Sequence, residues 1–130
     1  MSSSQIDSPV GGELAAAISN GVVRLMREYT GRGPTKARTY MKDDLVSVVL
    51  EDSLTKGEQS LVHDGEKKLV LQARKAYQRT MQDDLVSLVE TLTGRKVVAF
   101  LSDNHLEPDI AIESFVLESS SHPASADGTV

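Results

Sequence analysis

The stretch that decides the fold lies in the middle of the chain and reads Leu45-Val46-Ser47-Val48-Val49-Leu50. Its β-branched side chains favour an extended strand over a helix. Successive side chains of a strand point to opposite faces, and here both faces are apolar. One face carries Val46, Val48 and Leu50, and the other carries Leu45 and Val49. A strand of this kind belongs inside a sheet that is covered on both sides.

Three further segments have the character of strands, and together with the first they make two hairpins. Arg38-Thr39-Tyr40-Met41 precedes the central stretch, with Asp43-Asp44 as the turn. Val97-Val98-Ala99-Phe100-Leu101 is a strand with two apolar faces, followed by a loop over residues 103–109 and a last strand over residues 110–117. The alternative for the first hairpin is one long bent strand.

A first helix is predicted over residues 13–30, where apolar residues recur at helical spacing. Gly31 follows the last periodic residue and is suited to a left-handed cap, and Gly33-Pro34 prevents any continuation. Gly21 lies inside the helix, where the absence of a side chain would let another element approach closely.

A second helical region opens with a capping box formed by Thr55 and Glu58. Gly65 interrupts it, and a helical pattern then continues from Glu66 to Thr93. A helix of this length, about 40 Å, exceeds the radius of a small domain, so it either kinks or packs on a second subunit. The predicted apolar stripe is Leu69, Ala73, Ala76, Met81, Leu85, Leu88 and Leu92.

The two halves of the chain resemble each other. Thr30-Gly31-Arg32 ends the first helix and Thr93-Gly94-Arg95 ends the second, and each is followed by a hairpin. The sequence therefore predicts an α+β fold, a two-layer α-β-β-α-β-β arrangement with a four-stranded, mainly antiparallel sheet and helices on one face. The pentapeptide Asp-Asp-Leu-Val-Ser occurs twice, at residues 43–47 as predicted turn and strand and at residues 83–87 as predicted helix.

One domain is expected over residues 12–118. Residues 1–11 and 119–130 are polar or rich in serine and lack periodicity, so they are predicted to be disordered tails.

The composition excludes several classes of function. The 130 residues include no cysteine, which excludes disulfides, thiolate metal sites and cysteine nucleophiles. Aromatic residues make up 4% and the net charge is -5, and both weigh against nucleic-acid binding. No apolar run is long enough to span a bilayer and no secretory signal is present, so a cytoplasmic protein is expected.

Charge is distributed unevenly, with six basic residues against one acid over residues 24–42 and six acids without Lys or Arg over residues 97–130. This asymmetry would steer an anion or an acidic partner to one face. The candidate ligands of a small anion are Arg32, Lys36, Arg38 and Tyr40. The alternative is a helix cap and tight turn with ordinary surface charges.

The sequence contains no recognisable catalytic set. The three histidines lack the spacing of a zinc site, and there is no nucleophile elbow, phosphate loop or dinucleotide fingerprint. We therefore predict no enzyme, no cofactor and no metal.

The two-sided strands predict an interface with a second chain. Helices of one protomer cover one face, so the other is expected to meet a partner, and a two-fold homodimer is the commonest solution. The alternative is that the long helical segment wraps both faces within a monomer. The predicted interface residues are Val46, Val48, Leu50, Val98 and Phe100.

Several short motifs over residues 12–118 together resemble a known protein family. They are Glu28-Tyr29-Thr30-Gly31-Arg32-Gly33-Pro34, Arg38-Thr39-Tyr40, Asp44-Leu45-Val46, Leu54-Thr55 with Glu58, Thr93-Gly94-Arg95-Lys96-Val97 and Phe115-Val116-Leu117. The chain is similar to the MpsC-like family of small bacterial proteins, named after a Na+-translocating, membrane-potential-generating system. The resemblance implies a soluble accessory to ion or inorganic-carbon transport, and it carries over no catalytic residue. The long helix departs from the family pattern, because Gln72, Gln78 and Thr80 stand where basic residues are expected.

These observations favour a non-enzymatic accessory or interaction protein. Its expected partners are a second copy of itself and a membrane transport protein, which would hold it at the inner face of the membrane without insertion into the bilayer. Two alternatives remain open, a sensor that binds bicarbonate, phosphate or a nucleotide, and a nucleic-acid-binding module.

Overall fold

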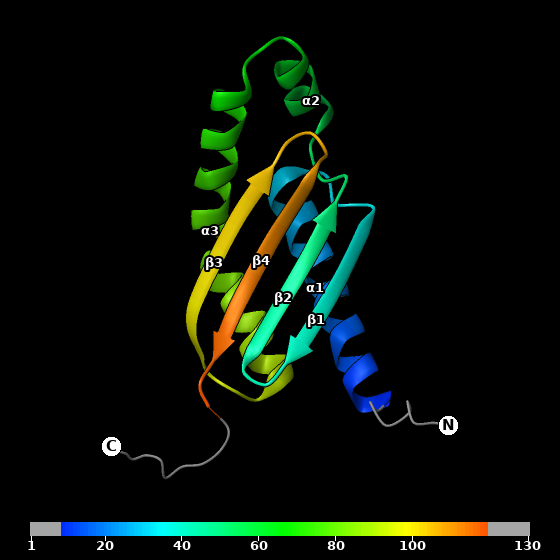
Figure 1. Ribbon diagram of the computed structural model, residues 1–130, viewed down its shortest axis with the longest axis vertical. Coiled ribbons are helices and arrows are strands. Elements are labelled where there is room, and N and C mark those ends of the chain that lie inside the picture. Colours follow the sequence, from blue (N-terminus) through cyan, green and yellow to red (C-terminus); the bar gives the residue numbers. More distant parts are fainter. Residues whose placement is uncertain (1–8, 120–130) are drawn as a thin grey trace.

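The computed structural model describes residues 9–119 of the 130-residue chain, and these form three helices and four strands (Figure 1). The predicted α+β class is confirmed. Along the chain the elements are α1 (Pro9–Thr30), β1 (Lys36–Lys42), β2 (Leu45–Glu51), α2 (Lys56–His63), α3 (Lys67–Thr93), β3 (Val97–His105) and β4 (Ile110–Leu117).

All four strands are antiparallel to their neighbours and lie in the order β1-β2-β4-β3. Both predicted hairpins are present, and the pairing of β2 with β4 joins them into one sheet. The first hairpin turns at Asp43 and Asp44, and Asp43 has a positive φ of 53°. Two-residue turns with positive φ match the twist of the flanking strands, and aspartate tolerates this conformation. The alternative of one long bent strand is therefore wrong.

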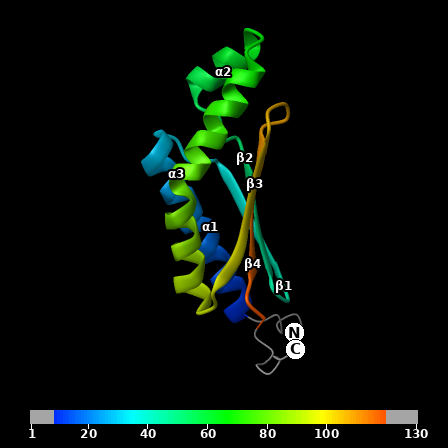
Figure 2. The same ribbon diagram turned by 90° about the vertical axis from the view of Figure 1, so that its left-hand side faces the viewer.

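The helices α1 and α3 lie side by side across one face of the sheet and leave the opposite face without a helix (Figure 2). They come close together at Gly21, where an added Cβ would lie 2.7 Å from the methyl carbons of Leu88. The predicted role of Gly21 as a point of close approach is confirmed. The alternative in which helices wrap both faces of the sheet is wrong for residues 9–119.

The hydrophobic core lies between these two helices and the sheet. Phe115 on β4 is fully buried there, and its ring centre lies 5.1 Å from that of Phe100 on β3. The helices contribute Ile18, Val22, Met26, Met81, Leu85 and Val89, and the central strands contribute Val46, Val48, Leu50, Ala111, Phe115 and Leu117.

Four of the five predicted interface residues belong to this core or pack against it. Val46, Val48 and Leu50 are fully buried beneath the helices, and Phe100 packs against the core from the same side. Their assignment to an interface with a second chain is wrong, because the helices take the entirely apolar face of β2 and leave the face that also carries Ser47 and Glu51. The fifth residue, Val98, is exposed at a bulge in β3.

Two element boundaries differ from the predicted ones. α1 begins at Pro9, so residues 9–11 are helical and not part of a tail. Proline suits the first helical turn, because the N–H that it lacks would have no partner there. β3 continues to His105, through residues predicted as loop, because they pair in register with β4. Of the predicted tails, residues 1–8 and 120–130 lie outside the described part of the chain.

α3 is one helix of 27 residues that extends past the sheet to contact α2 (Figure 1). Its N-terminal half packs within the same chain, since Val70 forms a second apolar cluster with Leu54, Val62 and Leu106. The part of α3 that extends past the sheet therefore packs against α2 and the loop residues of the same chain.

Gly31 closes α1 with a φ of +85°, and its N–H donates to the carbonyl of Arg27 at 2.9 Å. No atom lies within 4 Å of the position that a Cβ would take, so a side chain there strains only the backbone. We expect Gly31→Val to lower the free energy of unfolding by roughly 1–3 kcal/mol, measured by urea denaturation. Gly31→Asn is the matched control and should lose clearly less, because asparagine adopts this conformation more readily. Equal stability of Gly31→Val and the wild type would contradict the cap.

Candidate functional site

The candidate functional site is the face of the sheet opposite the helices, which we call the open face (Figure 1). Side chains alternate along each strand, so the neighbours of the buried core residues point to this side. Strand pairing places them in four rows that cross β1, β2, β4 and β3 in that order. The rows are Lys36, Glu51, Ile110 and His105; Arg38, Val49, Ile112 and Asp103; Tyr40, Ser47, Ser114 and Leu101; and Lys42, Leu45, Val116 and Ala99.

Large apolar side chains are exposed across the open face. Leu101 is 59% exposed, Tyr40 is 52% exposed, and Leu45 and Ile112 are 44% and 42% exposed. An apolar side chain that is exposed alone is normal on a protein surface, but a contiguous group on one face marks a place where another surface binds. The half-buried Val49 is paired with Ile112, so the apolar group continues between the two central strands.

The two edges of the open face carry charges of opposite sign. β1 presents Lys36, Arg38 and Lys42, whereas the exposed Asp103 lies on β3. Arg38 Nη1 donates to Tyr40 Oη at 3.3 Å, and this hydrogen bond raises the pKa of Arg38 above its usual value. The guanidinium is thus held, in its charged form, beside the apolar centre of the face.

Of the four predicted anion-binding residues, Arg32 is separated from the other three. Arg32 Nη1 donates to the carbonyl oxygens of Asp52 and Leu54, and Arg32 Nη2 donates to the carboxylate of Asp52 at 3.0 Å. Hydrogen bonds from Thr35 and Arg32 lower the pKa of Asp52. Arg32 therefore ties the segment after α1 to the end of β2. The other three predicted ligands lie on the open face of β1, and they are Lys36, Arg38 and Tyr40.

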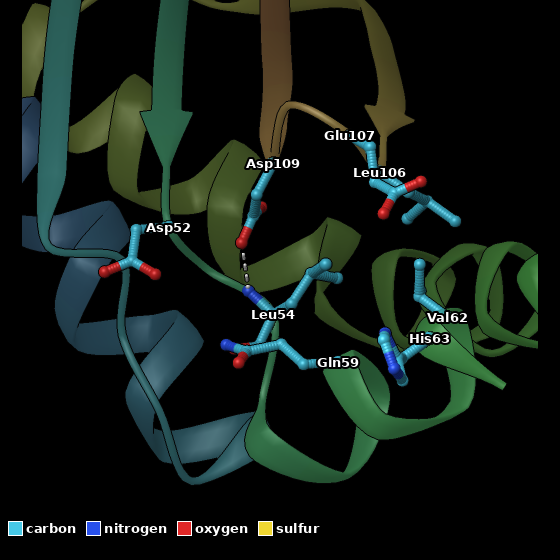
Figure 3. Close-up of a pocket in the computed structure, with 8 residues that line it drawn as sticks. All are labelled: Asp52, Leu54, Gln59, Val62, His63, Leu106, Glu107 and Asp109. Atoms are coloured by element: carbon cyan, nitrogen blue, oxygen red, sulfur yellow. Dashed lines mark hydrogen bonds between the residues drawn. The ribbon is translucent and has the colours of Figure 1, made fainter.

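A pocket of about 310 Å³ lies at the end of the sheet nearest α2 (Figure 3). Its acidic side chains are already engaged. Asp109 accepts from the backbone N–H of Leu54 at 3.0 Å, Glu107 pairs with Lys67 at 2.9 Å, and Asp52 has the contacts described above. Within residues 9–119, no group of three or more His, Asp or Glu side chains could hold a metal ion. The lining residues are Asp52, Leu54, Gln59, Val62, His63, Leu106, Glu107 and Asp109.

A buried polar layer lies between α3 and the sheet, and its members are Ser53, Arg74, Gln78, Asn104 and Glu113. Arg74 is almost fully buried, and it pairs with the carboxylate of Glu58 at 3.1 Å and donates to Ser53 Oγ at 2.8 Å. The side-chain amides of Gln78 and Asn104 exchange two hydrogen bonds of 3.1 Å each. Most of the polar groups in this layer are thereby satisfied, as burial requires.

The sequence reasoning missed this layer. It assigned Leu69, Ala73 and Ala76 to the buried side of α3. Two members of the predicted stripe, Met81 and Leu85, are buried as expected, but in the N-terminal half of α3 the buried face is shifted by one or two positions. The buried side chains of α3 lie three and four residues apart, and they are Val70, Arg74, Gln78, Met81, Leu85 and Val89. The spacing alone could have identified this face. Arg74 and Gln78 concealed it, because long polar side chains are mostly exposed.

Glu113 on β4 is the least satisfied member of the polar layer. It is fully buried, its Oε2 accepts from Gln78 Nε2 at 3.4 Å, and its Oε1 has no hydrogen-bond partner. Burial raises the pKa of Glu113 to about 7, although the neighbouring hydroxyl of Ser102, the charge of Arg74 and the hydrogen bond from Gln78 act in the opposite direction.

Comparison with known proteins agrees with the resemblance seen in the sequence. A protein-family model described as "Na+-translocating membrane potential-generating system (MpsC)" matches residues 11–119. The chain belongs to the MpsC family. No curated protein and no solved structure gives a match. Within residues 9–119 of this MpsC chain, none of the helices combines the length and the apolar character that a membrane crossing needs.

The stability of this MpsC chain should depend on the protonation of Glu113. Its pKa rises from 4.5 to about 7 on folding. Between these values the folded chain binds a proton that the unfolded chain has released, so the free energy of unfolding falls as the pH rises. We expect Glu113→Gln to abolish this pH-dependent change, which amounts to up to about 3 kcal/mol in the free energy of unfolding. Above about pH 7 the variant should be more stable than the wild type.

Urea unfolding at several pH values from about 5 to about 8 measures this difference. Asp83→Asn, an exposed acid-to-amide change on α3, is the matched control and should leave the wild-type pH dependence in place. Parallel stability curves for Glu113→Gln and the wild type would show that Glu113 keeps an ordinary pKa in the folded state.

Proposed function

We propose that this MpsC-family chain is a non-enzymatic accessory protein that binds another protein through its open face and works beside a membrane transport system for ions or inorganic carbon. The observation that carries the proposal is the open face itself. Its apolar side chains are uncovered within the described chain, while Val46, Val48 and Phe115 on the opposite face of the central strands are fully buried beneath α1 and α3.

The energetics of the open face support protein binding. Burial of apolar surface contributes about 25 cal/mol per Å², so each side chain that is still half exposed has roughly 1 kcal/mol to gain from a partner. Tyr40 also combines an apolar ring with a polar end, a property that enriches tyrosine in interfaces. The gain summed over Leu45, Leu101, Ile112 and Tyr40 is roughly 4 kcal/mol. It offsets the lower end of the cost of association, about 4 kcal/mol, and charge pairs must contribute the rest.

The charges define the chemistry of the bound surface. It must be apolar in the middle, must place a carboxylate against Arg38, and must place a cation against Asp103. These two charges lie at opposite edges of one row of the sheet. A partner with one sign of charge throughout would be repelled at one of the two edges.

The link to transport is supported by the family description, which names a Na+-translocating membrane-potential-generating system. In this proposal the chain stays on the cytoplasmic side and reaches the inner face of the membrane through its protein partner. The proposal includes no catalytic step, and it gives Lys36 and Arg38 a role in protein binding rather than in the binding of a small anion.

A single apolar-to-acidic change on the open face tests the proposal. We expect Leu101→Glu to reduce the membrane transport protein that co-purifies with the tagged chain from its native host by roughly tenfold, because a buried charge opposes the interface. The readout is quantitative mass spectrometry of the detergent-solubilised membrane fraction.

Leu69→Glu is the matched control, since Leu69 is 49% exposed on α3, away from the open face, and Leu101 is 59% exposed. The control should co-purify the same amount of partner as the wild type. Equal recovery with Leu101→Glu, or no membrane protein recovered with the wild type, would overturn the proposal.

A further inference from the structure

We infer that the partner of the open face is a second copy of this chain, related to the first by a two-fold axis that runs parallel to the strands between β2 and β4. The inference rests on the proposed function, because it names the protein that covers the open face. The membrane transport protein then associates with the assembled dimer, and Leu101→Glu lowers its recovery by weakening that dimer. It follows from the order of the rows and from the charges at their ends.

A rotation of 180° about this axis exchanges the two edge strands, while every residue keeps its position along the strand direction. The partner's β3 then lies over β1, and the partner's β4 lies over β2. Each row of the open face therefore meets the same row in reverse order. Because the interface is symmetric, every contact between unlike residues occurs twice.

The charged row is complementary to itself under this rotation. It runs Arg38, Val49, Ile112 and Asp103 from β1 to β3. Arg38 of one chain meets the partner's Asp103, and Asp103 meets the partner's Arg38, so the dimer gains two ion pairs at opposite edges. Packed sheets cross at about 30°, and the long Arg38 side chain can follow the small displacement that this angle causes at an edge.

The other rows fit the same arrangement. Tyr40 meets the partner's Leu101, and Leu45 meets the partner's Val116, so that exposed apolar groups face one another. Nearest the axis, Ser47 Oγ and Ser114 Oγ lie 2.7 Å apart and share a hydrogen bond. This pair is small, so the two sheets can approach closely at the axis. The hydrogen bond uses one of the two hydroxyl hydrogens, and the other faces the same serine pair of the partner.

The row of Lys36 adds no second ion pair between the chains. Lys36 and Glu51 are directly paired on neighbouring strands and compensate each other within one chain. The specificity of the dimer therefore depends on Arg38 and Asp103.

The charges also exclude the other simple way of stacking two copies. A two-fold axis in the plane of the sheet but perpendicular to the strands would place β1 on the partner's β1. Lys36, Arg38 and Lys42 of both chains would then face one another, and like charges oppose association.

A charge-swap experiment on the full-length chain tests the inference. We prepare Arg38→Asp and Asp103→Arg separately and measure the dimer dissociation constant by analytical ultracentrifugation. In each variant alone, both inter-chain pairs become like-charged, so we expect the dissociation constant to rise roughly tenfold or more.

An equimolar mixture of the two variants should instead form a heterodimer. The carboxylate introduced in the first variant then faces the guanidinium introduced in the second. At the opposite edge, the unchanged Asp103 of the first variant faces the unchanged Arg38 of the second, so both pairs have opposite charges again.

The mixed sample distinguishes contacts between chains from effects within one chain. Tags of different mass on the two variants let native mass spectrometry count heterodimers, and we expect them to outnumber both homodimers. The double variant Arg38→Asp/Asp103→Arg should dimerise as the wild type does. Arg79→Asp and Asp83→Arg, which change exposed charges on α3, are the matched controls and should leave the dissociation constant unchanged.

Each other outcome counts against the inference. A wild-type monomer at all concentrations would overturn it, and so would a dimer that neither single variant weakens. If the wild type is a monomer and Leu101→Glu still reduces the membrane protein recovered with it, the proposed function stands and the open face binds a different protein. If the charge swap behaves as expected but no membrane protein is recovered, the dimer stands and the link to transport is lost.

Discussion

Two helices can cover only one face of a four-stranded sheet, and the rest of the structure depends on this limit. Helices packed about 10 Å apart match the width of four strands spaced about 4.8 Å, so α1 and α3 together cover one face. They bury Val46 and Phe115 there, and no other described element covers the opposite face. The same strands therefore have two different faces, since one stabilises the chain beneath the helices and the other keeps its apolar side chains exposed in the described residues.

The side of the sheet beneath the helices is itself divided into two parts. Around Phe115 the contacts are apolar, whereas towards α2 the first turns of α3 bring polar side chains against the sheet. Arg74 is buried there at a cost in solvation, which its ion pair with Glu58 and its hydrogen bonds to Ser53 and Asn104 offset. For Glu113, the charge of Arg74 and the hydrogen bond from Gln78 only partly offset the cost of burial, and the raised pKa is the physical result.

The sequence predicts the elements well because their signals are local. The capping box at Thr55, the left-handed glycine at Gly31 and the turn at Asp43 all have the predicted geometry. The pentapeptide at 43–47 and 83–87 has the same residues in a strand hairpin and in α3, and its flanking periodicity separates the two cases. Local composition alone would have assigned one structure to both.

The sequence says less about which face of the sheet the helices cover and which strands become neighbours. One alternating set in β2 is entirely apolar, whereas the other includes the polar Ser47 and Glu51. The prediction weighs only the apolar members Leu45 and Val49 of the second set, and it therefore places Val46 on the wrong side. Arg38 and Tyr40 were named as ligands of an anion because of their charge and polarity. Their position beside an apolar row becomes visible only when strand register brings β3 into the same sheet.

The polar layer has a consequence for the placement of α3. An entirely apolar stripe could slip along the sheet by one helical turn, about 5.4 Å, and still bury similar surface. Such a slip here would separate Gln78 from Asn104 and leave the charge of Arg74 without Glu58. These hydrogen bonds and the ion pair fix the position of α3 along its axis relative to the sheet. They determine how far the N-terminal end of α3 extends beyond the sheet, and therefore where α2, which packs against that end, is held.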